Sequence, residues 1–139
     1  MTTMREIRAK LLAQHADIRA CIAETRAATT TTDAEALRRC VGRLADAVRT
    51  HNVAEEDALK TVLPTIDAWG KERRDVMLSE HVNEHADLYT ALVESSTAAT
   101  AAHVATLLDR MSEHMAVEER TFLGAELLTD DVKTDGAGG

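Results

Sequence analysis

The sequence contains few aromatic residues and few residues that interrupt helices. Aromatic side chains make up 2% of its 139 residues and are limited to Trp69, Tyr89 and Phe122. There is one proline, Pro64, and three of the six glycines lie in the last four positions. Because sheets favour aromatic and β-branched residues, an all-β sandwich or barrel is disfavoured. The scarcity of proline and glycine favours long helices.

The sequence also has few cysteines, and it shows neither a long apolar run nor the pattern of an export signal. The two cysteines, Cys21 and Cys40, are too few for a disulfide scaffold. We interpret them as small residues of the core or its boundary. No apolar stretch reaches the roughly 18 residues that a membrane helix needs, and residues 1–10 are charged, unlike a secretory signal. We therefore expect a cytoplasmic protein in a reducing environment.

Positive charge is in the minority. The chain has 16 lysines and arginines against 24 acidic residues, which gives a net charge of -8. Since nucleic acids and anionic membranes attract basic proteins, we expect no partner of either kind. Apolar residues at 45% and charged residues at 29% are typical of a folded, soluble chain. The length suits one domain, and the mixed acidic surface favours a monomer.

Apolar residues recur at three- and four-residue spacing in four long segments, which is the pattern of amphipathic helices. The breaks lie at the threonine run 29–32, at residues 64–70 and at the small polar residues 95–100. Asp33 is positioned to cap the second helix. The predicted helices cover residues 4–28, 34–63, 71–94 and 101–128. They predict an all-α, antiparallel up-down-up-down four-helix bundle over residues 1–128, followed by an acidic, glycine-rich flexible tail over residues 129–139.

Histidine and glutamate interrupt the apolar face of the predicted helices. Residues four positions apart lie above one another on a helix, so a pair with that spacing reaches one site. Burying such polar groups without partners is costly, and metal ions offset that cost. The interrupting residues are His15 in the first helix, His51 and Glu55 in the second, His81 and His85 in the third, and His114 and Glu118 in the fourth.

These residue types predict a metal site in the core of the bundle. Imidazole and carboxylate groups bind iron, zinc and manganese, and the set is too large for one tetrahedral zinc ion. It suits two adjacent ions bridged by two carboxylates and a small group such as oxide or hydroxide. The alternative is a structural bundle without metal, in which replacing His81 and His85 by leucine would only stabilise the protein. His103 lies about 16 Å along the helix from His114 and is interpreted as a helix-end residue.

The order and spacing of these residues resemble the hemerythrin-like family, also called the HHE cation-binding domain. The resemblance covers about residues 7–128, and the family implies a four-helix bundle that holds two non-haem iron ions. The iron with two histidines would keep an open position for dioxygen or another small ligand. The matching motifs are His15, His51-Asn-Val-Ala-Glu55-Glu56, His81-Val-Asn-Glu-His85 and His114-Met-Ala-Val-Glu118-Glu119. The resemblance implies that His81, His85 and His114 hold one iron, that His15 and His51 hold the other, and that Glu55 and Glu118 bridge them.

The last carboxylate departs from the classical oxygen carriers of the family, which place an aspartate five residues after the histidine. Here Glu118 follows His114 by four residues, and Glu119 follows it by five. Glu118 lies on the same helix face as His114, whereas Glu119 is rotated about 100° further. We therefore favour Glu118 as the bridging residue, with Glu119 as the alternative.

The ligand types favour capture of a small molecule over demanding oxidation. A histidine-rich site carries less negative charge than a four-carboxylate di-iron site and stabilises high oxidation states less. We expect a protein that binds dioxygen, nitric oxide or peroxide for sensing, storage or stress protection. The sequence leaves open a di-iron enzyme that detoxifies peroxide or nitric oxide, an iron donor for iron–sulfur cluster repair, and a metal other than iron. An apolar lining would limit water and proton access, with Ile18, Val48, Leu88, Met111 and Phe122 as candidates.

Overall fold

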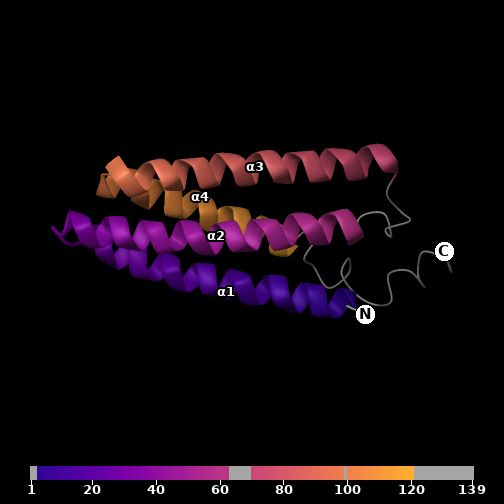
Figure 1. The fold of residues 1–139 in the computed structure, drawn as a ribbon, viewed down its shortest axis with the longest axis horizontal. Helices are drawn as coiled ribbons and strands as arrows, with labels where there is room; N and C mark the ends of the chain where they lie inside the picture. The colour runs from indigo at the N-terminus through magenta and orange to yellow at the C-terminus, as the bar shows by residue number, and fades with distance from the viewer. Residues whose placement is uncertain (1–2, 63–69, 99, 121–139) are drawn as a thin grey trace.

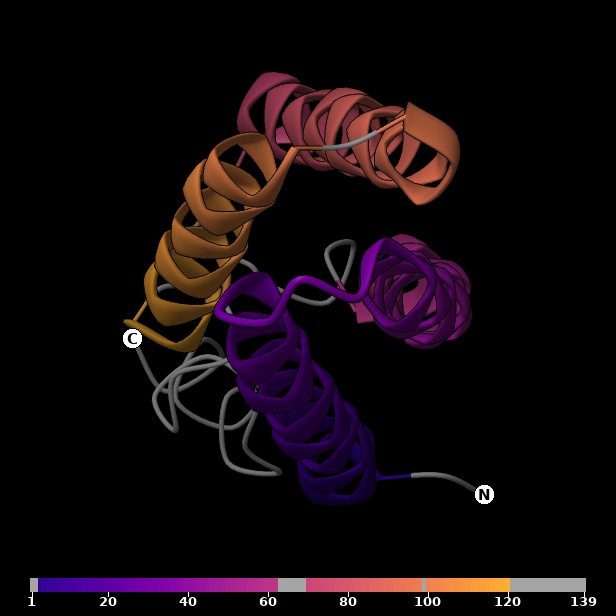
Figure 2. The ribbon, with the colours of Figure 1, turned by 90° about the vertical axis from the view of Figure 1, so that its left-hand side faces the viewer.

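The computed structural model of the chain is an antiparallel bundle of α-helices (Figure 1). It describes residues 3–62, 70–98 and 100–120. These residues form α1 (Met4–Thr29), α2 (Ala34–Val62), α3 (Lys71–Ala98) and α4 (Ala101–Arg120). Seen end-on, the helices surround a common axis in chain order (Figure 2). Each packs against the next, and α4 packs back against α1. The predicted all-α four-helix bundle is confirmed.

Polar side chains cap the first turns of three helices. Thr3 and Glu6 form a reciprocal capping box at the start of α1. Asp33 caps α2 through a 3.1 Å hydrogen bond from a backbone N–H of the first turn, as predicted. Thr100 caps α4 in the same way at 3.2 Å. Such caps satisfy N–H groups that have no partner inside the helix. The starts of α1, α2 and α4 are thus specified locally.

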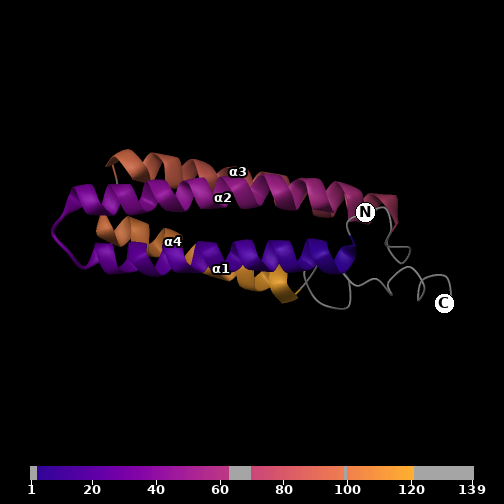
Figure 3. The ribbon, with the colours of Figure 1, turned by 60° about the horizontal axis from the view of Figure 1, so that its bottom comes forward.

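The structure confirms the predicted break at the threonine run but not the predicted end of the third helix. The hydroxyls of threonines 29–31 donate to carbonyl oxygens of the last turn of α1, and this competition ends the helix before the short connection to α2 (Figure 3). The prediction that α3 ends at Glu94 was wrong, because α3 continues to Ala98. Serine and alanine cost little in a helix, and Ser95 is buried. Residues 121–139, with the predicted end of the fourth helix and the tail, lie outside the described part of the chain.

Two apolar clusters fill the bundle on either side of a polar layer. Leu11 and Leu59 belong to the smaller cluster, between α1 and α2. The half-buried thiols of Cys21 and Cys40 pack at the edge of the larger cluster, as predicted. None of the described helices combines the length and apolar character that a membrane span requires. The buried members of the larger cluster include Ile18, Ile22, Leu37, Val41, Leu44, Val48, Leu88, Leu92, Val104, Leu107, Leu108, Met111 and Met115.

Truncation of Leu108 tests whether this core stabilises the bundle. Its side chain is 0% exposed, so we expect Leu108→Ala to lower the free energy of unfolding by about 2–5 kcal/mol. Val53 is 58% exposed, and Val53→Ala should change it by less than about 0.5 kcal/mol. Urea denaturation followed by circular dichroism measures both values. Similar values for the two variants would contradict the packing described.

Candidate metal centre

All of the predicted histidine and glutamate ligands meet at one level of the bundle. Each of them continues an apolar stripe that faces the axis, which is why the fold turns them inward. By contrast, His103 is exposed near the start of α4 and does not join them, as predicted. The residues brought together are His15 from α1, His51 and Glu55 from α2, His81 and His85 from α3, and His114 and Glu118 from α4, of which His81 and His114 are half-buried and the others buried.

The ligand-type atoms form two overlapping groups that share both glutamates. Within each group these atoms all lie within 4.8 Å of one another. His81 belongs to neither group but lies next to the second. Its Nε2 is 3.4 Å from Glu118 Oε2 and 3.8 Å from Glu55 Oε1. The first group is His15, His51, Glu55 and Glu118, and the second is Glu55, His85, His114 and Glu118.

The two oxygens of Glu55 face different histidines. Oε2 lies 2.6 Å from Nε2 of His51, on the same helix. Oε1 lies 3.1 Å from Nε2 of His85, on α3. The carboxylate therefore extends from one group of histidines to the other. A carboxylate in this position is able to bridge two cations that are held by different histidines.

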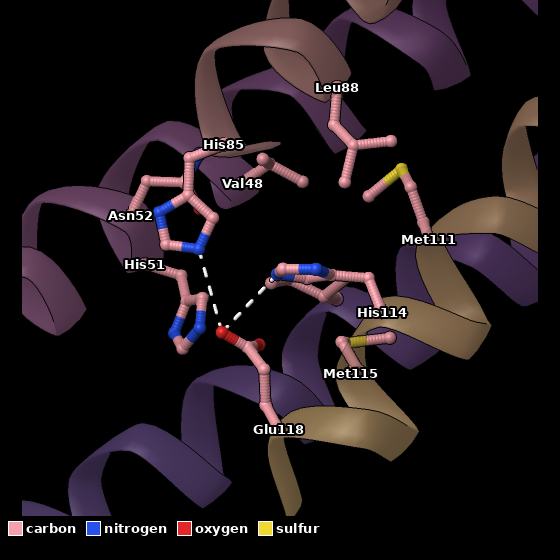
Figure 4. A pocket seen from close by; sticks show the side chains of 10 residues that line it. Val48, His51, Asn52, His85, Leu88, Met111, His114, Met115 and Glu118 are labelled. Atoms are coloured by element: carbon pink, nitrogen blue, oxygen red, sulfur yellow. Dashed lines mark ion pairs between the residues drawn. The ribbon is translucent and has the colours of Figure 1, made fainter. Parts of the chain in front are cut away.

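Glu118 divides its oxygens in the same manner. Oε1 lies 3.2 Å from Nε2 of His15. Oε2 lies 3.2 Å from Nε2 of His114, a contact that Figure 4 marks with a dashed line. Glu119, the alternative considered above, is turned outward. It accepts a 2.7 Å hydrogen bond from Nδ1 of His15 and two 2.8 Å hydrogen bonds from Arg19. Of the two neighbouring carboxylates, Glu118 is the one whose oxygens lie between the histidine groups.

Each of the five histidines directs Nε2 into the cluster and uses Nδ1 for an outer hydrogen bond. Carboxylates and carbonyls only accept hydrogen bonds, so Nδ1 carries a proton. In the neutral imidazole, Nε2 is then the nitrogen that a cation can bind. The acceptors are Glu119 for His15 at 2.7 Å, Gln14 Oε1 for His51 at 2.9 Å, the Met77 carbonyl for His81 at 3.1 Å, Glu56 for His85 at 2.9 Å and Glu84 for His114 at 2.7 Å.

Atoms inside the cluster are crowded but poorly hydrogen-bonded. Both oxygens of Glu55 and the Nε2 atoms of His85 and His114 are buried. They lie within ion-pair distance of other cluster atoms, yet none makes a hydrogen bond of suitable geometry within the described residues. Burying polar atoms without hydrogen bonds is costly. Cations placed among these nitrogen and oxygen atoms would satisfy them, so the donor set fits metal ions.

The charges of the cluster attract cations. Burial lowers the pKa of His85, but Glu118 and Glu55 outweigh burial and raise that pKa to about 10. Burial by itself would raise the pKa of Glu118, but the close contacts of its carboxylate with Glu55 and with the histidines lower it. Carboxylates that hold protons on nearby imidazoles this strongly also favour metal cations. The pKa values of His15, His81 and His114 are raised in the same way, against the effect of burial.

A small cavity of about 20 Å³ adjoins the cluster (Figure 4). Since one water molecule needs roughly 10–15 Å³ by this measure, the cavity has room for one small molecule, such as water or a diatomic gas. Sequence reasoning missed Asn52 and Met115, each of which directly follows a cluster histidine, and Phe122 lies outside the described residues. The lining consists of Ile18, Val48, Leu88 and Met111, as predicted, together with Asn52, Met115, His51, His85, His114 and Glu118.

Comparison with known families agrees with the geometry. The family model of the hemerythrin HHE cation binding domain matches residues 6–125. The match includes every histidine and glutamate of the cluster. No curated protein and no solved structure matches the chain.

Proposed function

Because the chain belongs to the hemerythrin HHE cation-binding family, we propose that it binds dioxygen or a related small molecule at a pair of iron ions. The observation that carries this proposal is the division of the carboxylate oxygens. In Glu55 and in Glu118, one oxygen faces His15 or His51 and the other faces the histidines of α3 and α4. Two ions that share two carboxylates fit this arrangement better than a single ion does.

In this proposal each group of histidines holds one ion. A pair of ferrous ions supplies the electrons and the open coordination position that binding of dioxygen or nitric oxide requires. The position near α1 and α2 has fewer histidines, which leaves space for a small ligand. The ligands are His15 and His51 for one ion and His81, His85 and His114 for the other, with Glu55 and Glu118 shared.

The cavity favours a small, weakly polar ligand. Five of its lining side chains are aliphatic or thioether groups, and together they come from all four helices: Ile18, Val48, Leu88, Met111 and Met115. Such a lining keeps water and protons away from a reduced metal centre and slows its irreversible oxidation. Asn52 adds a polar amide to this lining. These features support reversible binding over an oxidising reaction.

Exposure of the reduced protein to dioxygen tests this proposal. The protein is loaded with ferrous iron without oxygen, and its iron content is measured. We expect two irons per chain and, on adding dioxygen, a long-lived visible absorption band that disappears when oxygen is removed. Direct and irreversible passage to the spectrum of the oxidised centre would contradict reversible binding. It would favour an enzyme that acts on peroxide or nitric oxide.

Metal binding should release protons at pH 7. In the metal-free protein the pKa of His85 is about 10, so its imidazole is protonated at neutral pH and must lose that proton to bind a cation. The affinity for ferrous iron should therefore fall as the pH falls, and the contribution of His85 should end above about pH 10. Calorimetric titration in two buffers with different protonation enthalpies counts the protons. Equal heats in the two buffers would contradict this prediction.

A further inference from the structure

Four of the outer hydrogen bonds form a closed ring around the bundle. In each of them, a side chain of one helix holds Nδ1 of a histidine on the next helix. The ring runs in one direction and returns to its starting helix. Its members are Gln14 of α1 with His51 of α2 at 2.9 Å, Glu56 of α2 with His85 of α3 at 2.9 Å, Glu84 of α3 with His114 of α4 at 2.7 Å, and Glu119 of α4 with His15 of α1 at 2.7 Å.

The position of each acceptor in the sequence explains the ring. Every acceptor is the immediate neighbour of a cluster residue, as Glu56 is of Glu55 and Glu84 is of His85. One step along a helix turns the side chain by about 100°. The acceptor therefore points away from the axis and towards the adjacent helix. His81 is the exception, because its Nδ1 donates to the Met77 carbonyl of its own helix.

The half of the ring near α3 has carboxylates as both of its acceptors. His85 donates to Glu56, and His114 donates to Glu84. Within the described part of the chain, no lysine or arginine forms an ion pair with either carboxylate. Both acceptors are therefore anionic partners of histidines in the second group.

The half of the ring near α1 is close to neutral. His51 donates to the uncharged amide of Gln14. His15 donates to Glu119, but Arg19 binds both oxygens of that carboxylate at 2.8 Å. The guanidinium compensates the charge of its partner. The two halves of the ring thus differ by about two negative charges.

We propose that Gln14, Glu56, Glu84 and Glu119 are positioning residues that fix the inward orientation of Nε2, and that their uneven charge makes the two metal positions unequal. A carboxylate on Nδ1 raises the basicity of Nε2. The position at His85 and His114 therefore holds its cation more tightly and stabilises its oxidised state more than the position at His15 and His51 does. This inference rests on the proposed pair of metal ions.

Substitutions that change the charge of the ring in opposite directions test the inference. Glu56→Gln and Glu84→Gln keep a hydrogen-bond acceptor and remove a negative charge. Each should lower the affinity for one of the two ferrous ions by about 10- to 100-fold and raise the midpoint potential of the loaded centre. Gln14→Glu adds a negative charge to the ring. Arg19→Gln removes the positive charge that compensates Glu119. Both substitutions should therefore lower the midpoint potential.

The control is the substitution Glu113→Gln. Glu113 is an exposed residue of α4 that lies outside the ring and pairs with Arg120 at 3.6 Å. The substitution should leave the potential unchanged. Iron content at saturation and helical circular dichroism are measured for every variant. Potentials that do not move in Glu56→Gln and Glu84→Gln, with two irons bound, would overturn the inference and leave the proposed function standing. Potentials that rise in all four variants, including Gln14→Glu and Arg19→Gln, would show a structural effect and would also overturn it. Failure of the unaltered chain to hold two irons would overturn both.

Discussion

Glu118→Gln should cost the protein both metal ions, because the oxygens of this carboxylate lie in both groups of ligands. The loss of affinity at each position should exceed the 10- to 100-fold that outer partners of ligands contribute. By comparison, His51→Ala removes a residue of one group and should leave the other position able to bind. Iron content after desalting, measured by atomic absorption, gives the stoichiometry of both variants.

Two other glutamates of α4 serve as controls for this substitution. Glu119→Gln keeps the outer hydrogen-bond acceptor and should retain two ions at saturating iron. Glu113, whose side chain is 71% exposed, should tolerate glutamine with no change in affinity. Loss of both ions in Glu119→Gln, together with their retention in Glu118→Gln, would reverse the assignment of the bridging residue.

Metal loading should raise the melting temperature on the order of 10 °C or more. Five histidines and two glutamates are packed at one level of the bundle, and several of their buried atoms make no good hydrogen bond. Ions that bind the folded chain but not the unfolded chain stabilise the fold. The gain is about 4 kcal/mol per position when the free ion concentration is a thousand times the dissociation constant. Differential scanning calorimetry without oxygen, with and without ferrous iron, measures the shift.

Histidine variants separate this effect from non-specific stabilisation. His85→Leu removes a residue of the second group and should remove about half of the rise, because the other position can still bind its ion. His103 is exposed, so His103→Gln should melt with the same metal-dependent rise as the unaltered protein. If iron leaves the melting temperature unchanged while leucine at His81 and His85 raises it, the bundle is purely structural and the metal account is wrong.

The sequence was sufficient to predict the fold and the meeting of the cluster residues. In α2, Leu37, Val41, Leu44 and Val48 recur at helical spacing, and all are buried. His51 and Glu55 continue this stripe, so their place in the core followed from periodicity. Their convergence with residues of the other helices followed from the bundle itself. Their role as metal ligands remains a prediction.

The ring of outer acceptors could not be predicted from spacing within one helix. Glu56 and Glu84 occupy positions that a helical pattern assigns to the boundary between core and surface, where glutamate is common and uninformative. Their partners lie on neighbouring helices, so the register between helices decides the contact. The same reason applies to Glu119, whose outward turn depends on Arg19 and His15 of α1. The end of α3 was missed because burial of Ser95 outweighed a weak local signal.

In the proposed function, the cluster holds two ions that share Glu55 and Glu118. The most direct test is a crystal structure of the iron-loaded protein, with diffraction data collected on both sides of the iron absorption edge. We expect two iron peaks in the anomalous difference map. One should lie among His15, His51 and the two glutamates, and the other among those glutamates, His85 and His114. A single peak, or iron bound only outside the cluster, would contradict the account.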